Sequence, residues 1–254
     1  MHDVKNIDIQ IPFRRLKYDY CIETYGSDKP DTRYDLKLQD VKDVLSKINF
    51  EAFKTAKVIK ALVIENHASV TTRKVIDGIN LHAKKFGLGG LTVLKYINHQ
   101  LEGSFLKFFE PEQIDELVKT LNLKEDDLVI IGAGIKMKVC PCLGALRTQY
   151  AKEMNLIKPN TFDFLWVVDF PLFDYNEDTK EISPCHHPFT QPKESDIEKL
   201  KTHPEQVYAS AYDIIVNGYE AGGGSLRIYD QNLQKEIFEL LGFTEEDIQR
   251  KFGF

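Results

Sequence analysis

Hydrophobic and polar positions follow two different patterns in the first part of the central region. Residues 57–65 (KVIKALVIE) form a short run rich in β-branched side chains, which predicts a strand. Residues 71–86 instead carry apolar side chains at helical spacing, and Gly87 follows as a stop signal. The pattern therefore predicts a strand followed by a helix.

Two further strand-like runs come next. Residues 91–97 and 104–109 are rich in apolar and aromatic side chains, and the polar stretch 98–103 between them ends in glycine. A polar, glycine-containing stretch between two such runs is typical of a hairpin. We therefore expect two paired strands here.

A helix and a last strand complete the central region. Pro111 stands where a first-turn proline belongs, and an apolar face follows it at Ile114, Leu117, Val118 and Leu121. Residues 128–132 (LVIIG) then predict a buried strand, and a further helix is expected over 138–154. The resulting order β-α-β-β-α-β is that of the ferredoxin-like, or split βαβ, unit.

The central region shows little sign of chemistry. Residues 132–134 (Gly-Ala-Gly) lack both a third glycine at dinucleotide spacing and a following Gly-Lys-Ser/Thr, so we interpret them as an ordinary turn. Cys140 and Cys142 could form a zinc site with Cys185 and His186, but C-x-C is not the usual spacing and lies in a helical pattern.

A buried strand and a loop with two histidines open the last hundred residues. Residues 164–173 (FLWVVDFPLF) predict a strand that ends at Pro171. His186 and His187 follow in a loop that Pro188 bounds. Adjacent histidines beside a buried strand can face a ligand, although a loop histidine is often simply solvated.

The stretch 208–228 is the most informative part of the chain. Asn-Gly at 217–218, between two β-like runs, is a strong hairpin signal because both turn positions need positive φ. With a two-residue loop, Asp213 faces Gly222 and lies on the same face as Glu220. Their Cα atoms should then be about 7–8 Å apart, which suits two carboxylates that share a hard cation.

Glycines and an arginine extend this candidate site. Gly222, Gly223 and Gly224 remove side chains from the strand, which is best explained by the close approach of a ligand or of backbone. The guanidinium of Arg227 can hold a carboxylate through two hydrogen bonds. Together these residues suggest a site for a magnesium-bound nucleotide and an acid substrate. A solvated hairpin with incidental charges is the alternative.

Composition limits the class of protein. The chain has 254 residues, of which 43% are hydrophobic and 28% charged, as in a soluble globular protein. Its apolar runs are far shorter than the roughly 20 residues of a membrane-spanning helix. The first residues show no signal or transit pattern, and four scattered cysteines suit a reducing compartment. We expect a cytoplasmic protein without a membrane partner.

Charge is distributed unevenly along the chain. The net charge of −6 argues against a uniformly positive surface for nucleic acid. Residues 57–156 carry 14 Lys and Arg against 11 Asp and Glu, whereas the remainder carries 19 against 28. This difference predicts that the two regions belong to different domains.

Four separated motifs together resemble the bacterial-type aspartyl-tRNA synthetases, which are class II aminoacyl-tRNA synthetases. In order they are residues 25–33 (YGSDKPDTR), 164–171 (FLWVVDFP), 186–190 (HHPFT) and 217–228 (NGYEAGGGSLRI). The resemblance covers essentially the whole chain. It implies an α+β fold in which part of the class II antiparallel sheet, flanked by helices, is interrupted by a ferredoxin-like (βαββαβ) insertion domain.

The resemblance also implies a division of the chain and a reaction. Residues 1–48 and 157–254 would be catalytic-domain segments, and residues 49–156 would be the insertion domain. The implied function is that of an aspartate-tRNA ligase. The aspartate carboxylate attacks the α-phosphorus of ATP, and the aspartyl group then passes to tRNA. Mg²⁺ and arginine would offset the repulsion between the two anionic reactants.

Roles for individual residues follow from the same resemblance. His186 and Arg227 would bind aspartate, with Arg227 pairing the side-chain carboxylate. Glu220 would contact ATP, and Asp213 and Glu220 would hold Mg²⁺. Arg227 and Glu220 are the residues to which the resemblance assigns catalysis, so the expected ligands are L-aspartate, ATP, Mg²⁺ and tRNA.

The departures from the family pattern concern segments that this sequence does not include. The family's anticodon-binding OB domain, its dimer motif and an arginine-bearing motif would precede residue 1, and an ATP-clamping Gly-x-Asp-Arg motif would follow residue 254. We therefore interpret the sequence as an internal stretch of an enzyme expected to be a homodimer, and predict that this stretch alone is inactive. The alternatives are a non-catalytic, synthetase-derived binding module and a metallohydrolase built on His186, His187 and the carboxylates.

Overall fold

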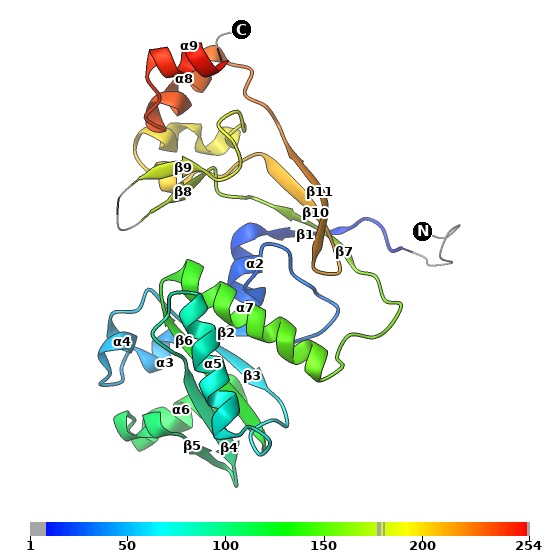
Figure 1. Cartoon of the computed structure of the whole chain (residues 1–254), viewed down its shortest axis with the longest axis vertical. Helices are drawn as coiled ribbons and strands as arrows, with labels where there is room; N and C mark the ends of the chain where they lie inside the picture. Colours follow the sequence, from blue (N-terminus) through cyan, green and yellow to red (C-terminus); the bar gives the residue numbers. More distant parts are fainter. Residues whose placement is uncertain (1–8, 177–178, 180, 253–254) are drawn as a thin grey trace. The chain divides into compact units, whose positions relative to one another are not determined.

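The computed structural model describes residues 9–176, 179 and 181–252. The chain divides into two compact units, one made of residues 1–19 with 164–254 and the other of residues 20–163 (Figure 1). Each unit is mixed α+β, and each contains its own sheet. The α+β class expected from the sequence is confirmed.

A five-stranded sheet forms the centre of unit 20–163. Its order is β2-β3-β6-β4-β5, and all neighbouring strands are antiparallel. Its strands are β2 (Leu38–Asp40), β3 (Val58–Ile64), β4 (Thr92–Ile97), β5 (Gln100–Glu102) and β6 (Asp127–Gly134). Because β3 and β4 both run antiparallel to the β6 strand between them, β3 and β4 run parallel to each other.

Helices cover both faces of this sheet. They are α3 (Lys42–Leu45), α4 (Glu51–Lys54), α5 (Arg73–Lys85), α6 (Pro111–Leu121) and α7 (Lys136–Glu153). Helix α2 (Tyr18–Tyr25) precedes them in the chain. One face packs on α3, α4 and α6 through a continuous apolar core that includes Ile59, Leu94 and Val129. Helices α5 and α7 lie across the sheet side by side, and His82 Nε2 of α5 is 3.2 Å from the Cys142 carbonyl of α7 (Figure 1).

The helix predicted from Pro111 is confirmed, and its ends have the expected chemistry. Pro111 occupies the first turn, and Glu110 and Gln113 form a capping box. The last turn closes on Asn122 in the left-handed conformation (φ 50°). Leu117 and Leu121 are buried, as the apolar spacing predicted.

The prediction of a strand over residues 104–109 is wrong. Residues Ser104–Phe108 form a 3₁₀ helix, η1, and β5 pairs with β4 at residues 100–102 instead. The two-residue turn of this hairpin is Asn98-His99, and both residues have positive φ (51° and 57°). A short apolar run does not distinguish a strand from a buried helical turn, and the side chains of η1 pack on the core.

Strand β2 lies before the predicted domain boundary at residue 49. It pairs with β3, so Leu38–Asp40 belongs to the sheet of unit 20–163. Three residues are too few to show a periodic pattern, so this strand could not be predicted from the sequence. Among the described residues, this sheet shares no strand with the sheet that contains Asp213.

A buried arginine of α7 holds an irregular segment in place. Arg147 is 1% exposed, donates to the carbonyls of Leu36 and Asp31, and donates to the Tyr34 hydroxyl at 2.9 Å. Its guanidinium lies 5.0 Å from the ring centroid of Tyr25 and 4.1 Å from that of Tyr34. These contacts replace the water that the charge loses on burial.

The end of α2 and the middle of α7 meet backbone to backbone. Gly26 has φ 69°, and a Cβ added there would lie 2.2 Å from the Cys140 carbonyl oxygen. A Cβ at Gly144 would lie 2.5 Å from the Gly26 carbonyl oxygen. Only glycine allows this approach from both sides.

The two α7 cysteines behave as core residues. Cys140 and Cys142 are fully buried, and burial raises the pKa of each thiol to about 11. In the part of the chain that the structure describes, no group of three or more His, Cys, Asp or Glu side chains could hold a metal. The zinc site considered from the sequence therefore has no support.

The second sheet belongs to the unit of residues 1–19 and 164–254. Its order is β1-β7-β10-β11, with β1 parallel to β7 and the other pairs antiparallel. Its strands are β1 (Arg14–Lys17), β7 (Phe164–Val168), β10 (Ala211–Val216) and β11 (Tyr219–Ser225). The predicted strand from residue 164 is present, but it ends at Val168 because Asp169 takes a left-handed conformation (φ 60°).

Shorter elements surround this sheet. They are β8 (Phe173–Tyr175), β9 (Ile182–Pro184), η2 (Glu194–Lys201), η3 (Pro204–Gln206), α8 (Gln231–Leu240) and α9 (Glu245–Phe252). Helix α8 begins with Asp230, whose carboxylate accepts from the Leu233 N–H at 2.8 Å. None of the described helices combines the length and apolarity needed to cross a membrane.

Candidate functional site

The hairpin of β10 and β11 carries the candidate carboxylates. Its turn is Asn217-Gly218, with φ of 54° and 84°, as the Asn-Gly signal predicted. Next to the turn, Val216 faces Tyr219 and Ile215 faces Glu220. The predicted hairpin and its first two pairs are therefore confirmed.

Beyond Glu220 the register differs from the prediction. It shifts between Ile214 and Ile215 because Ala221 has no partner opposite, so Asp213 faces Gly223 and not Gly222. Such a bulge cannot be read from an Asn-Gly turn, which specifies only the pairs next to it. Asp213 is two residues from Ile215, the partner of Glu220, so strand alternation still places both carboxylates on one face of the hairpin.

Gly223 makes room for the Asp213 carboxylate. A Cβ added to Gly223 would lie 2.0 Å from Asp213 Oδ1 and 2.9 Å from its Cγ. The carboxylate thus lies directly across the glycine of the neighbouring strand. This observation gives a structural reason for one glycine of the Gly222-Gly223-Gly224 run.

The two carboxylates fit the ligand preferences of magnesium. In nucleotide sites Mg²⁺ keeps several waters and is held by one or two carboxylates together with substrate phosphates. Asp213 and Glu220 supply such a pair, and the absence of a side chain at Gly223 lets the Asp213 carboxylate lie across the neighbouring strand. The donor set therefore fits Mg²⁺ shared with a phosphate.

Replacing Gly223 tests this arrangement. We expect Gly223→Ala to displace the Asp213 carboxylate and to weaken magnesium-dependent ATP binding by roughly tenfold or more, the equivalent of at least about 1.4 kcal/mol. The matched control is Gly222→Ala, where the nearest atom to an added Cβ is 3.9 Å away. Titration calorimetry of Mg-ATP against both variants measures the effect. Equal affinities would contradict the proposed role of Gly223.

Arg227 lies beyond the end of β11 and is tied to the histidine loop. The Ile228 N–H donates to the Phe189 carbonyl at 3.0 Å, and Thr190 forms a β-bridge with Arg227. Arg227 Nη1 donates to His187 Nδ1 at 3.1 Å and to Ser225 Oγ at 3.2 Å. These contacts orient an exposed guanidinium at the end of the glycine-rich strand.

His187 takes part in this arrangement as a hydrogen-bond acceptor. Besides Arg227, its Nδ1 lies 3.2 Å from the Phe189 N–H and 3.3 Å from Thr190 Oγ1. A nitrogen that accepts from an arginine carries no proton, so the imidazole is neutral with its hydrogen on Nε2. Burial lowers the pKa of His187, and the charges of Arg227 and His186 lower it further.

The lowered pKa of His187 predicts a pH dependence. The folded-state pKa lies below the unfolded value of about 6.5, so the contact with Arg227 stabilises the loop above that pH and is lost as the pH falls through the folded pKa. We expect an NMR titration of the imidazole to show a midpoint below that of an unstructured reference peptide. Arg227→Ala should raise the midpoint. A midpoint above the reference would contradict the assignment.

His186 occupies a different position from its neighbour. Its exposed imidazole packs edge-on against Phe170, with ring centroids 5.1 Å apart, and the contact with Arg227 comes from His187. The sequence indicated a ligand-facing role for adjacent histidines but did not show which one would contact the arginine. Which of the two histidines contacts Arg227 depends on how the loop turns between Pro184 and Thr190.

A cleft on the second sheet was not foreseen from the sequence. It has a volume of about 500 Å³ and includes Trp166, Tyr212 and Leu226. The rings of Trp166 and Tyr212 meet edge-on, 5.8 Å apart, and Lys193 pairs with Asp169 at the rim. Tyr212 and Asp213 are adjacent on β10, so this cleft lies on the opposite face of the strand from the carboxylates.

Comparison with known proteins decides the family. The sequence model of the tRNA synthetases class II (D, K and N) matches residues 1–254. The chain belongs to this family. The recognition drawn from the four motifs is thereby confirmed, and the candidate site lies in a class II tRNA synthetase sequence.

Curated relatives of this class II synthetase chain carry one consistent name. Aspartate-tRNA ligases of Macrococcus caseolyticus, Halalkalibacterium halodurans and Enterococcus faecalis are 44%, 43% and 44% identical to it over 258 aligned residues. A relative from a Geobacillus species, 42% identical, is named aspartate-tRNA(Asp/Asn) ligase. Each alignment covers 100% of this chain but only 43–44% of the relative, so the chain spans less than half the length of these relatives.

One solved structure shows a limited likeness. A hypothetical protein from Pyrococcus horikoshii OT3 covers 40% of this chain and 53% of its own, with 20% identity and a TM-score of 0.31. A TM-score this low supports no conclusion about fold or function.

Proposed function

We propose that this chain is part of an aspartate-tRNA ligase, which activates L-aspartate with ATP and transfers the aspartyl group to tRNA. The observation that carries the proposal is the exposed guanidinium of Arg227, oriented by a neutral His187 at the end of a glycine-rich strand that also bears Glu220. The names of the relatives support the same activity.

Arg227 is proposed to select aspartate. The guanidinium presents a planar fork of donors, and a carboxylate presents two matching acceptors. The amide of asparagine offers only one acceptor oxygen, and its NH₂ group would meet the arginine donors. His187 and Ser225 accept from Nη1, so the fork left for a carboxylate is formed by the N–H groups of Nε and Nη2. His186, exposed in the same loop, is proposed as a second contact to aspartate.

Glu220 and Asp213 are proposed to bind the nucleotide. Glu220 is the proposed contact to ATP, and together with Asp213 it would hold Mg²⁺. When bound, the ion supplies positive charge that neutralises the phosphates. Gly223 has no side chain, so the Asp213 carboxylate can take its place across the strand.

In the proposed reaction an aspartate carboxylate attacks the α-phosphorus of ATP, the bond from this phosphorus to the bridging oxygen breaks, and pyrophosphate leaves. Both reactants are anionic, so the contribution of this chain is to hold them in contact and to balance their charge. Arg227 is proposed to anchor the side-chain carboxylate, which leaves the α-carboxylate free to attack. Arg227 and Glu220 are therefore the residues to which we assign catalytic roles.

The division into domains is part of the same proposal. Residues 49–156 would correspond to the family's ferredoxin-like insertion domain, supported by the succession β3-α5-β4-β5-α6-β6, with β2 joining its sheet from the preceding segment. Residues 1–48 and 157–254 would be catalytic-domain segments. We further propose that the whole protein is a cytoplasmic homodimer with tRNA as its partner.

Amino-acid-dependent exchange of pyrophosphate into ATP tests the proposal. The protein that contains this chain should exchange pyrophosphate with L-aspartate and Mg²⁺, and should not do so with L-asparagine or L-lysine. Aspartylation of tRNA should follow in the same preparation. Intact folding without aspartate-dependent exchange would instead support a synthetase-derived binding module.

A further inference from the structure

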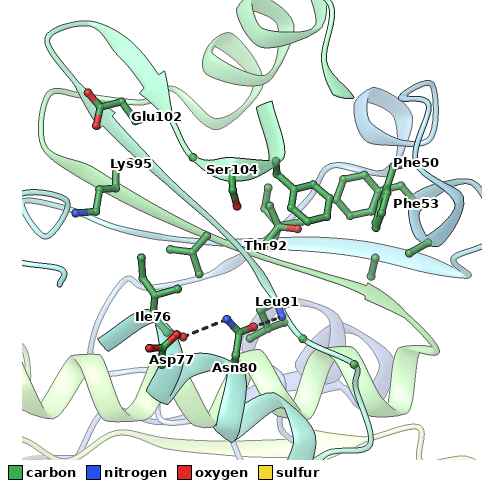
Figure 2. A pocket seen from close by; sticks show the side chains of 18 of the residues that line it. Phe50, Phe53, Ile76, Asp77, Asn80, Leu91, Thr92, Lys95, Glu102 and Ser104 are labelled. Atoms are coloured by element: carbon green, nitrogen blue, oxygen red, sulfur yellow. Dashed lines mark hydrogen bonds between the residues drawn. The ribbon is translucent and has the colours of Figure 1, made fainter. Parts of the chain in front are cut away.

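A cleft of about 780 Å³ lies in unit 20–163, between helix α5 and strand β4 (Figure 2). This volume falls within the range of small-molecule sites. Figure 2 shows Phe50 and Phe53 at one end of the cleft and Asp77 and Asn80 of α5 toward the other. None of the residues proposed above for aspartate or ATP belongs to this unit.

The aromatic end of the cleft presents ring edges and faces to a ligand. Phe50 meets Phe105 at 4.6 Å and Phe53 at 5.2 Å between ring centroids, both nearly perpendicular. Phe53 is buried, whereas Phe50 and Phe105 are only partly buried and line the cleft. A flat ring placed here would extend the cluster by further edge-to-face contacts.

The opposite end presents oriented polar groups. Asn80 Oδ1 accepts from the Leu91 N–H at 2.9 Å, and its Nδ2 donates to the Ile76 carbonyl at 3.2 Å, so the amide orientation is fixed. A Cβ at Gly90 would come within 2.9 Å of Asn80 Oδ1, so the glycine permits this contact. The Oδ1 of Asp77 accepts a hydrogen bond from Arg73 Nε, with 3.3 Å between the two atoms.

Two hydroxyls lie between these ends. Thr92 and Ser104 both line the cleft, and Figure 2 shows them in its centre. Thr92 is 6% exposed, and within the described residues no hydrogen bond of its hydroxyl is found. The Thr92 hydroxyl oxygen is therefore reached by solvent from the cleft, and a polar group of a ligand can replace a water molecule there and take over its hydrogen bond.

The charges around the cleft balance one another. Arg73 pairs with Asp77 on α5, and Lys95, which donates to the Thr71 carbonyl, faces Glu102 across the β4-β5 ladder. A phosphate group on a ligand would meet the carboxylates of Asp77 and Glu102. The two cations of this set, Arg73 and Lys95, already have hydrogen-bond partners. The electrostatics therefore favour an uncharged ligand.

We propose that this cleft binds an uncharged nucleoside. Its base would lie against Phe50 and Phe105, and its sugar hydroxyls would bond to Asp77 and Thr92. Carboxylates commonly hold ribose hydroxyls in nucleotide-binding proteins. This site is independent of the proposed aminoacylation site, so either can fail without the other.

A matched pair of glycine variants tests the site. Gly89 lines the cleft and Gly78 does not, and a Cβ added at either position meets nothing within 4 Å. Both Gly89→Leu and Gly78→Leu should therefore fold. Adenosine is the probe, measured by titration calorimetry and by NMR shifts on the whole chain. We expect Gly89→Leu to weaken adenosine binding by roughly tenfold or more, and Gly78→Leu to leave it unchanged.

Other probes separate the ligand classes. Adenosine that shifts the resonances of Phe50 and Thr92, and binds more tightly than AMP or indole, would support the proposal. Tighter binding of AMP at these residues would overturn the assignment of an uncharged ligand, and equal binding of indole would overturn the role of the sugar. Adenosine binding that survives Gly89→Leu would place the nucleoside elsewhere and reject this site.

Discussion

Arg227→Ala is expected to lower kcat/KM for aspartate in pyrophosphate exchange by roughly 10²–10³-fold, the equivalent of about 3–4 kcal/mol. Truncation removes both donors that would meet the substrate side chain and leaves that carboxylate without a counter-charge. Arg227→Lys keeps the charge but not the fork, so it should recover only part of this loss. We also expect both variants to discriminate less well between aspartate and asparagine.

The control for this prediction is a second exposed arginine. Arg250 on α9 pairs with Asp247 three residues before it, and Arg250→Ala should leave exchange unchanged. The KM for ATP should also change little in Arg227→Ala, because the nucleotide is assigned to other residues. Unaltered aspartate kinetics in that variant would show that Arg227 does not bind the substrate side chain.

Arg147→Ala is expected to cost roughly 3–4 kcal/mol of stability. The variant would leave the carbonyls of Leu36 and Asp31 buried without their donor, and it would open a cavity between Tyr25 and Tyr34. Arg147→Lys should rescue little of this loss, since one ammonium cannot reach several acceptors that lie in different directions. Urea unfolding measures the loss.

The matched control lies on the same helix. Lys152 of α7 is exposed, and Lys152→Ala should change stability by no more than about 0.5 kcal/mol. Hydrogen exchange should show that residues 31–36 lose protection first in Arg147→Ala. If these residues stay protected while the rest of the unit is destabilised uniformly, Arg147 does not act through this segment.

Much of the fold could be predicted because long periodic segments carry strong signals. The helix from Pro111 and the strand at 58–64 have clear apolar spacing, and both are present. The three-residue strand β2 is too short to show periodicity. The apolar run at 104–108 forms a 3₁₀ helix, and its side chains could reach the core from a strand or from a helical turn, so the apolar pattern did not distinguish the two. Pairing across long sequence separations, such as β3 with β6, depends on packing that a local pattern does not contain.

The candidate site was predictable where turn chemistry acts locally. Asn217-Gly218 specifies a tight turn, and therefore the first pairs of the hairpin. The bulge at Ala221 could not be foreseen, because one extra residue is set by how β11 fits its neighbours. The same holds for His187, whose contact with Arg227 requires the 186–190 loop to lie beside the segment that follows β11.

The contact between Gly26 and Gly144 has a consequence for sequence variation in the family. Each glycine fills the space into which a side chain on the other would project, so a change at either position is not relieved by a change at the other. Compensated pairs of substitutions should therefore be absent, and both positions should remain glycine wherever α2 and α7 cross this closely. The motif of residues 25–33 begins where α2 and α7 cross. In a distant homologue in which these two helices lie farther apart, we therefore expect the sequence of this motif to differ.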